Sequence, residues 1–496
     1  MTAETPRAGQ TGLVLLAGFA FARLVFDTTL GLGRDEAYTL VVSRRLALSY
    51  FDHPPLHQWL AHYSALAFGE TVFARTPFVV LFALTGWLVY MLGRELFSER
   101  AGLVALVALN VSPFFFASAG GWIVPDGPLL AALVAAALAL ARVLFRETTP
   151  RETWALWIAA GAAFGLAGLS KYSAVLSGLG LFAFLIASPR HRRWFAHPAP
   201  YVAALLALAL FAPALIWNAD NDWVSLRFQS ARGSPSGKFG FGPVLGNLLA
   251  QIAYLTPWVF AGFAAGVLWA QRAWRRGDDR GMFLVCLASP PILLFTLTPL
   301  WGPHGLPHWS MPGWFFLYPL LGAALAERNL RRSGAASAAF IVVVFALLVV
   351  QADFGVAQQL AGRDFSDPTL EALDWRELKA AIGAPADFVV VTKWWEAGKA
   401  GVALGPETPI FVFSDDPRGV AFLDDSARFV GRDADLVVER DKLAATQDAL
   451  RPYFQTFEAP RFVALRRGGR VEVELAVVRA RNLTHAFAAP YRQRRS

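Results

Sequence analysis

Residues able to carry out acid–base chemistry gather in a few short segments. Asp35 and Glu36 stand side by side in GLGRDEAYTL, and Asp52, His53 and His57 follow in YFDHPPLHQWLAH. A carboxylate beside a reacting hydroxyl can act as a general base. The alternative is structural, since an acidic pair also caps the helix that follows it. Spacing alone favours this structural alternative.

Two prolines follow Asp52 and His53 directly. They fix two successive φ angles and force the preceding residue to be extended, which would hold Asp52 and His53 rigidly, as a functional site requires. The alternative is an ordinary turn before the helix that carries His57. Asp52, His53 and His57 lack a strong metal-ligand spacing, so we expect no metal site, although a divalent ion stays possible.

Asp126 and Lys171 are the next candidates. Asp126, in WIVPDGPLL, could belong to a site or simply cap a helix. The chain has 39 Arg and only 6 Lys, and Lys171 and Lys238 are the only lysines before residue 353. Lys171 lies between two apolar runs, and its compact ammonium suits a phosphate oxygen. We favour this role over a side chain that snorkels to the membrane interface.

Weaker candidates surround these residues. Arg23 and Asp27, four residues apart in the first apolar run, predict an internal ion pair. The stretch 215–233 predicts a surface loop, either a lid or an ordinary long loop. His304, His308 and Trp309 could stack on a sugar, although most Trp residues are explained by membrane interfaces.

The elements that must position these residues are mostly membrane helices. The chain is 55% hydrophobic and only 17% charged, which excludes a soluble globular or a disordered protein. The formal net charge is +8, but the basic residues show no pattern typical of nucleic-acid binding. Apolar runs long enough to span a bilayer predict about eleven helices, near residues 11–32, 74–93, 101–118, 127–145, 154–170, 172–188, 199–217, 244–270, 281–299, 309–326 and 335–352.

Arginine predicts the orientation of these helices. Alternate connections between the runs are Arg-rich, which places them and the N-terminus in the cytoplasm. The other connections then face outward, together with the C-terminus, and they contain the acids and histidines named above. These outward connections are 33–73, 119–126, the junction at 170–172, 218–243 and 300–308.

The sequence predicts two domains, a transmembrane catalytic domain over 1–352 and a soluble α/β domain over 353–496. In the second, 387–392, 409–414, 435–440 and 461–467 predict strands, and 370–383 and 441–450 predict helices. Gly468 and Gly469 predict a hairpin. No catalytic motif is present there, so we expect a lid or an acceptor platform.

Several of these segments resemble one family of enzymes. RDEAYTL, YFDHPPLHQWL, PDGPLL, GLSKYSAVL and LIWNADNDWVSLRFQ are similar to the bacterial branch of glycosyltransferase family 39. That family includes the protein O-mannosyltransferases and is related to the lipid A aminoarabinose transferases. The resemblance implies the GT-C fold and a sugar donor built on a polyprenyl monophosphate, used on the external face of the membrane.

The resemblance also implies roles for individual residues. Asp35 would be the acidic residue of the active site, with Glu36 beside it, and Asp126 would be a second acid. Lys171 and His53 would contact the donor phosphate. His53 stands where the aminoarabinose enzymes have Lys, which leaves its charge state open. Further candidates for sugar or acceptor contacts are Tyr38, Asp52, His57, Asn218, His308 and Trp309.

Together these observations predict an inverting glycosyltransferase of the bacterial inner membrane, with its active site and C-terminal domain in the periplasm. The leaving polyprenyl phosphate needs charge neutralisation, whereas the acceptor hydroxyl needs a base. The expected partners are the lipid-linked donor, membrane lipids, and a lipid, glycan or protein acceptor. The alternative is a transporter or lipid flippase, but such a protein should show repeat symmetry and charges near the bilayer midplane.

Overall fold

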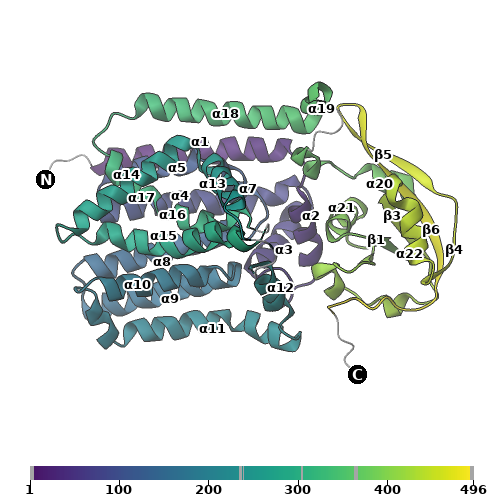
Figure 1. Cartoon of the computed structure of the whole chain (residues 1–496), viewed down its shortest axis with the longest axis horizontal. Coiled ribbons are helices and arrows are strands. Elements are labelled where there is room, and N and C mark those ends of the chain that lie inside the picture. The colour runs from purple at the N-terminus through teal and green to yellow at the C-terminus, as the bar shows by residue number, and fades with distance from the viewer. Residues whose placement is uncertain (1–4, 234–236, 238, 303–304, 362–366, 492–496) are drawn as a thin grey trace.

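The computed structural model describes the chain except residues 1–4, 234–236, 238, 303–304, 362–366 and 492–496, so Lys238 and His304 lie outside the described residues. A bundle of long helices forms one end of the molecule and a domain with a β-sheet forms the other (Figure 1). The chain is a multi-pass membrane protein of mainly α structure with a small α/β domain at its C-terminal end, as predicted.

Among the described residues, seven helices are long and apolar enough to cross a membrane, or nine if two bent pairs each count as one span. The seven are α1 (Thr5–Thr29), α4 (Thr76–Leu96), α8 (Asp126–Phe145), α9 (Pro150–Ser170), α11 (Ala199–Asp220), α15 (Arg280–Leu297) and α18 (Arg331–Phe354). The bent pairs are α5 (Glu99–Asn110) with α6 (Pro113–Phe116) and α7 (Ser118–Gly121), and α13 (Gly242–Leu255) with α14 (Pro257–Trp274).

The number of spans stays a prediction because two of the eleven predicted runs form shorter helices. The run at 172–188 forms α10 (Ala174–Ala187), which has 14 residues. The run at 309–326 forms α16 (Met311–Phe315) and α17 (Tyr318–Leu325) after a short 3₁₀ turn. A helix of 14 residues is about 21 Å long, which is less than the hydrocarbon thickness of a bilayer.

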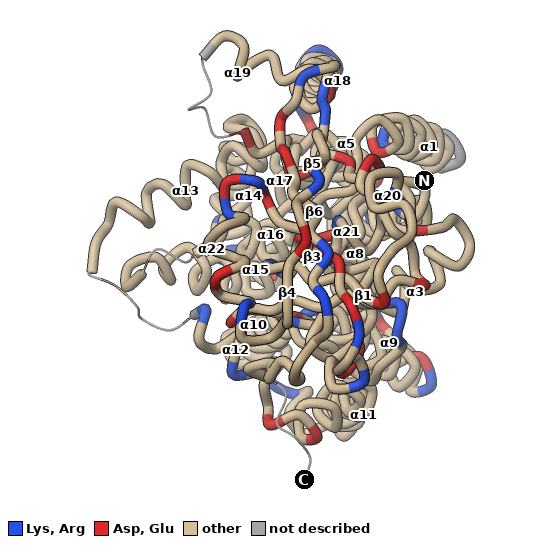
Figure 2. Tube along the Cα trace, turned by 90° about the vertical axis from the view of Figure 1, so that its right-hand side faces the viewer, with Lys and Arg blue, Asp and Glu red and all other residues tan. Residues whose placement is uncertain are grey.

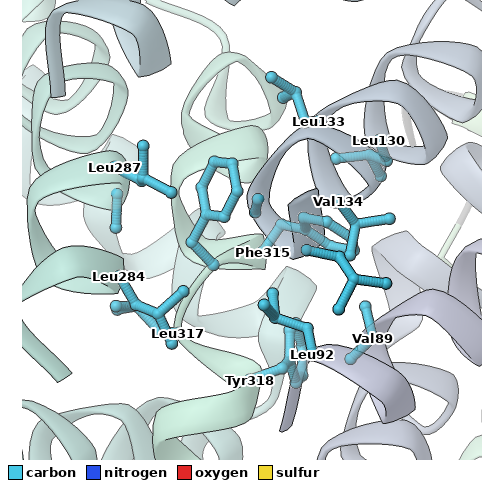
Figure 3. Close-up of a cluster of buried hydrophobic side chains, with 14 of the residues drawn as sticks. Val89, Leu92, Leu130, Leu133, Val134, Leu284, Leu287, Phe315, Leu317 and Tyr318 are labelled. Atoms are coloured by element: carbon cyan, nitrogen blue, oxygen red, sulfur yellow. The ribbon is translucent and has the colours of Figure 1, made fainter. Parts of the chain in front are cut away.

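The bundle has a closely packed apolar core. Figure 3 shows side chains from α4, α8, α15 and the α16–α17 segment meeting in one cluster. Phe315, Leu130 and Leu284 are among its fully buried members. Because most of α8 is buried, Asp126 at its first turn is held by a helix that the core fixes in place.

The Arg-rich connections meet at one end of the bundle. Arg142 and Arg146 both contact Glu95, and Arg280 Nη1 donates to the carbonyl oxygen of Leu96 over 2.9 Å. Arg100 Nη2 donates to the carbonyl of Arg328 over 2.8 Å. These contacts join the connections that the positive-inside rule assigns to one side of the membrane. Which end faces the cytoplasm stays a prediction.

The first outward connection contains two helices, α2 (Arg34–Ser43) and α3 (Leu56–Phe68). The predicted surface loop at 215–233 is wrong for most of its length, because α11 continues to Asp220 and residues 224–233 form α12 (Val224–Gly233), which leaves only a short turn at 221–223. Asp222 and Trp223 adopt left-handed φ angles of 54° and 57° and make the tight turn between α11 and α12. Asn218 Oδ1 accepts the N–H of Leu226 over 3.3 Å, which stabilises that turn.

The C-terminal domain is built on a six-stranded mixed sheet of order β2-β1-β3-β6-β4, with β5 paired to β6. Its strands are β1 (Phe388–Val391), β2 (Ile410–Val412), β3 (Ala434–Glu439), β4 (Phe454–Phe457), β5 (Arg461–Arg467) and β6 (Arg470–Leu483). The β1–β2 and β1–β3 pairs are parallel, and the pairs that β6 forms are antiparallel. Figure 2 shows charged residues concentrated along these strands, whereas the helices behind them are mostly uncharged.

Most of the predicted elements of this domain are confirmed. Strands form in all four predicted segments, and Gly468 and Gly469 make the predicted hairpin with positive φ angles of 55° and 80°. The predicted helix at 441–450 becomes α22 (Leu443–Leu450). The predicted helix at 370–383 is wrong as a single element, since a 3₁₀ turn at Pro368–Ala372 and α20 (Glu377–Ile382) replace it.

One helix that the sequence analysis missed, α21 (Trp394–Leu404), docks the C-terminal domain onto α2. A Cβ atom at Gly398 would lie 2.4 Å from the backbone nitrogen of Tyr38, so only glycine permits this approach. Lys399 Nζ donates to the carbonyl oxygens of Leu32 and Leu373 over 2.5 and 2.9 Å. The domain therefore contacts the segment immediately before Asp35, and α2 is held from both sides.

Candidate active site

The two adjacent acids of α2 have opposite surroundings. Glu36 is buried, and Arg75 donates to both of its carboxylate oxygens, from Nε over 2.8 Å and from Nη2 over 2.5 Å. The N–H groups of Gly33 and Ile123 also donate to it, over 2.8 and 3.1 Å. Burial would raise the pKa of Glu36, but Arg75 and these donors outweigh it and hold the pKa below its usual range. Glu36 thus fixes the entry into α2.

Asp35 is exposed, and it forms no hydrogen bond or ion pair with any residue in the described part of the chain. Burial of its surroundings, together with the nearby carboxylates of Glu371 and Asp52, raises the pKa of its carboxyl to about 6. Its carboxylate is open to solvent while protein encloses the region around it. A carboxylate in this state can accept a proton from a bound hydroxyl.

Asp52 links three parts of the molecule. It is buried; the Tyr38 hydroxyl donates to its Oδ2, and Arg418 Nη1 of the C-terminal domain lies 3.5 Å from its Oδ1. Gln229 of α12 donates to its backbone carbonyl. Burial raises the pKa of the Asp52 carboxyl, and Arg418 opposes that rise. Because its oxygens are engaged, Asp52 holds Tyr38 and Arg418 in place.

Two arginines reach the same region from other elements. The Arg418 guanidinium lies 4.0 Å from the ring centre of Trp394, and its backbone φ of 45° is in the left-handed region. The Arg232 guanidinium, on α12, lies 5.0 Å from the ring of Trp309 and 5.5 Å from that of Phe228. Arg232 forms no ion pair with a carboxylate among the described residues, so its charge is available to a ligand.

Asp126 and Lys171 form a buried ion pair between neighbouring helix ends. Lys171 Nζ lies 2.9 Å from Asp126 Oδ1, and the Oγ of Ser170 donates to the carbonyl of Pro125 over 2.6 Å. Asp126 is the first residue of α8 and does not cap it; Pro125 occupies the N-cap position. The cap alternative for Asp126 is therefore wrong, because its carboxylate is used by Lys171.

The histidines of the site are uncharged at neutral pH. Burial lowers the pKa of His57 to about 3 and that of His308 to about 4, and it lowers the pKa of His53 well below its usual range. The rings of His53 and His57 lie 5.5 Å apart, and the Nδ1 atom of each has no partner among the described residues. His53 can therefore donate a hydrogen bond to a phosphate but cannot neutralise its charge.

The remaining sequence-predicted residues differ in their surroundings. Trp309 supports Arg232, whereas the Asn218 side chain is fully engaged with Tyr172, Ala214 and Leu226 and holds α11 against α12. The predicted pair between Arg23 and Asp27 is wrong. Arg23 instead donates to Asn110 Oδ1 and to the carbonyl of Phe116, both over 2.8 Å.

No group of three or more His, Cys, Asp or Glu side chains within the described ranges has a geometry that could hold a metal ion. The charged groups described here are the open carboxylate of Asp35, the Asp126–Lys171 pair, Asp52 with Arg418, and Arg232. Such a set can accept a proton and stabilise an anion.

Comparison with known proteins identifies the architecture. Residues 52–217 match the family model described as dolichyl-phosphate-mannose-protein mannosyltransferase. The crystal structure of ArnT from Cupriavidus metallidurans bound to undecaprenyl phosphate superposes with a TM-score of 0.66, covering 95% of this chain and 98% of that one at 17% sequence identity. The chain has the GT-C fold. The fold and the family resemblance predicted from the sequence are confirmed.

Two curated relatives are similar to this chain in sequence. One is the undecaprenyl phosphate-alpha-4-amino-4-deoxy-L-arabinose arabinosyl transferase 2 of Proteus mirabilis, 28% identical over 344 residues, or 63% of this chain and 59% of the relative. The other is the lipid A galacturonosyltransferase RgtD of Rhizobium johnstonii, 28% identical over 311 residues, or 58% of this chain and 60% of the relative. The chain thus spans about 60% of the length of the curated relatives it matches.

Within this GT-C fold, the sequence analysis missed Arg418, Arg232 and Arg75. Arg418 lies in a domain without any recognisable motif, and it reaches Asp52 only because α21 docks on α2. Arg232 fell in a stretch interpreted as a loop, although LRFQSAR carries no proline or glycine and could have indicated a helix. Arg75 lies at the edge of the apolar run 74–93. A buried arginine needs a buried acid as its partner, which could have indicated its pairing with Glu36.

Proposed function

We propose that the chain is an inverting glycosyltransferase. It transfers a sugar, a hexose or a pentose, from a polyprenyl monophosphate to a hydroxyl group of a lipid, glycan or protein acceptor. The observation that carries this proposal is the state of Asp35. Its carboxylate has a pKa of about 6 and forms no hydrogen bond or ion pair among the described residues, and charged groups that can stabilise an anion lie around it.

The chemistry divides between two sets of residues. Asp35 takes the proton of the acceptor hydroxyl as its oxygen attacks the anomeric carbon. Direct displacement on the face opposite the phosphate inverts that carbon. Glu36 is a positioning residue in this scheme, because its carboxylate is occupied by Arg75 and two backbone amides.

The leaving polyprenyl phosphate gains negative charge as the bond to the sugar breaks. Arg232 and Lys171 supply positive charge, and the neutral His53 supplies a hydrogen bond. Arg232 is the stronger candidate of the two cations, because Asp126 already neutralises part of the charge on Lys171. The names of the curated relatives, which act with undecaprenyl phosphate sugars or on lipid A, support a polyprenyl-linked donor and a lipid-linked acceptor.

The proposal includes a location. The bundle spans the bacterial inner membrane with its Arg-rich end and N-terminus in the cytoplasm and with the site and C-terminal domain in the periplasm. Polyprenyl phosphate would then enter from the outer leaflet, level with the ends of α8 and α9, where Lys171 lies.

The test uses the full chain purified in nanodiscs. Polyprenyl phosphates carrying different hexoses or pentoses are offered with a membrane-glycolipid extract, and release of free polyprenyl phosphate is measured. Mass spectrometry of envelope glycolipids from cells with and without the protein identifies the product, and NMR of that product gives its anomeric configuration.

We expect sugar-dependent release of polyprenyl phosphate, a glycolipid present only with the protein, and an inverted anomeric carbon. The matched control is Asp35→Asn, which should release polyprenyl phosphate at least about a hundredfold more slowly while it still binds polyprenyl phosphate. A product with retained configuration would contradict the direct displacement. Translocation of intact donor across the membrane of sealed liposomes, without release of polyprenyl phosphate, would support the transporter alternative instead.

A further inference from the structure

A second hollow lies beside the residues described above. A cavity of about 1330 Å³ is enclosed by the connection between α2 and α3, the turn between α11 and α12, and the C-terminal domain. None of the acids, histidines or arginines assigned to the reaction above lines it. Its wall includes Phe51 and Gly419, the chain neighbours of Asp52 and Arg418, so it adjoins the reaction site.

Aromatic rings form part of this wall. The ring centres of Trp217 and Phe422 lie 5.3 Å apart, and those of Phe51 and Tyr491 lie 4.6 Å apart. Flat aromatic faces pack against the C–H faces of a sugar ring while leaving its hydroxyl groups free for hydrogen bonds.

The charged groups of the wall are mainly acidic. Asp220, Asp222, Asp424 and Asp425 line the cavity together with one basic residue, Arg45. Arg45 Nη1 donates to the carbonyl of Leu423 over 2.8 Å, Asp424 pairs with Arg428 at 3.4 Å, and Asp425 Oδ1 accepts the N–H of Ala427 over 3.0 Å. Carboxylates accept hydrogen bonds from sugar hydroxyl or amino groups, whereas they repel a phosphate group.

A buried hydroxyl group gives independent support for a ligand. Ser49 is completely buried at the wall of the cavity, and its Oγ has no hydrogen-bond partner among the described residues. Buried polar groups are nearly always satisfied, so an unpaired hydroxyl beside a cavity indicates a group that binds there.

We propose that this cavity binds the saccharide part of the acceptor, in a neutral or amino-substituted form without a phosphate group. This inference rests on the proposed function and specifies its acceptor. Trp217, Phe422 and Tyr491 pack against the sugar rings, Asp222 and Ser49 bind their polar groups, and the reacting hydroxyl reaches Asp35 past the adjoining residues Asp52 and Arg418. The acidic wall disfavours a phosphorylated saccharide.

The test measures binding and does not depend on turnover. The full chain in detergent is titrated by calorimetry with chitosan tetrasaccharide, maltotetraose and maltotetraose 1-phosphate, and separately with free polyprenyl phosphate. We expect the first two saccharides to bind and the phosphate group to weaken the binding of maltotetraose at least tenfold.

Trp217→Ala and Asp222→Asn should each weaken saccharide binding at least fivefold without changing the affinity for polyprenyl phosphate. Trp223→Ala is the matched control, because Trp223 is exposed near the same turn but does not line the cavity. Asp222→Asn keeps the size of the side chain, so it stays informative if Trp217→Ala does not fold.

Three results would overturn the inference: no saccharide binding by the folded wild-type chain, equal or tighter binding of the phosphorylated saccharide, or unchanged binding in both cavity variants. Failure of the proposed function looks different. In that case no sugar-charged polyprenyl phosphate is consumed, although maltotetraose still binds in the cavity.

Discussion

Lys171 Nζ lies 2.9 Å from Asp126 Oδ1, so the residue that ends α9 is joined to the first residue of α8 by a buried ion pair. This pair sits at the end of the bundle that carries Asp35 and the histidines. A donor phosphate at this level would compete with Asp126 for the ammonium of Lys171, and its binding would be coupled to the packing of these two helices.

Lys171→Ala should therefore weaken binding of free polyprenyl phosphate and slow transfer, and Lys171→Arg should restore part of both, because it keeps the charge with a different geometry. Calorimetry in detergent isolates the binding step. The double variant Lys171→Ala/Asp126→Ala removes both charges and thereby relieves the unpaired acid. If the double variant binds polyprenyl phosphate as wild type does, the pair is only structural.

The two acids of α2 should behave differently when each is replaced by its amide. Asp35→Asn should reduce transfer about a hundredfold or more with an unchanged melting temperature, because the amide cannot take the proton. Glu36→Gln should destabilise the fold by about 3 to 5 kcal/mol, because it leaves the buried Arg75 without its anion. Turnover per folded molecule and thermal unfolding distinguish the two. If Glu36→Gln is inactive but as stable as wild type, Glu36 and not Asp35 would be the general base.

The pH profile should report the pKa of Asp35. Asp35 works only as a carboxylate, so with a pKa of about 6 the rate should be constant above about pH 7 and fall about tenfold per pH unit below pH 6. The pKa values of His57 and His308, about 3 and about 4, lie too low to produce this limb. Single-turnover rates at saturating donor measure the profile. A rate independent of pH between 5 and 7 would exclude Asp35 as the base.

Arg232 and Arg227 form a matched pair on α12. Arg232 is held over Trp309 and Phe228 beside the site, whereas Arg227 is exposed. Arg232→Ala should weaken polyprenyl phosphate binding about tenfold or more, because a charge-assisted contact to a partly desolvated phosphate is lost. Arg227→Ala should leave the affinity unchanged. Equal effects of the two variants would mean that α12 attracts the donor only by its overall charge.

Docking of the C-terminal domain should depend on Gly398. Gly398→Leu places its Cβ 2.4 Å from the backbone of Tyr38, so α21 must move away from α2 and separate Arg418 from Asp52. We expect lower thermal stability, faster proteolysis in the C-terminal domain and loss of transfer. Ala380→Leu, at an exposed position of α20, is the control and should behave like wild type. Full activity in Gly398→Leu would show that the domain does not position the site.

The sequence predicted the membrane helices and the sheet strands well, because apolar runs and short β-branched segments report local preferences directly. It also grouped Asp35, Asp126, Lys171 and His53 at one end of the bundle, since alternating arginine-rich connections divide the chain into two sides. It could not distinguish Asp35 from Glu36. That difference depends on Arg75, which is 39 residues away in the chain and meets Glu36 only after folding.

The residues that the C-terminal domain contributes to the site could not be predicted from the sequence either. The contact between Asp52 and Arg418 joins residues 366 positions apart, and no local pattern encodes it. The left-handed turn at Asp222 and Trp223, which directs α12 back toward the site, is likewise set by tertiary contacts and not by a glycine or proline.

The distance in sequence between Asp52 and Arg418 has a consequence for biosynthesis. The chain is made from its N-terminus, so the apolar helices and Asp35 are complete long before residue 418 leaves the ribosome. Until α21 and Arg418 have docked on α2, Asp52 lacks its contact with Arg418 and the Tyr38 hydroxyl lacks the N–H donor of Gly419. Under the proposed function, a newly inserted bundle would bind a donor lipid without using it, and transfer would begin only after residue 418 has been made and has docked.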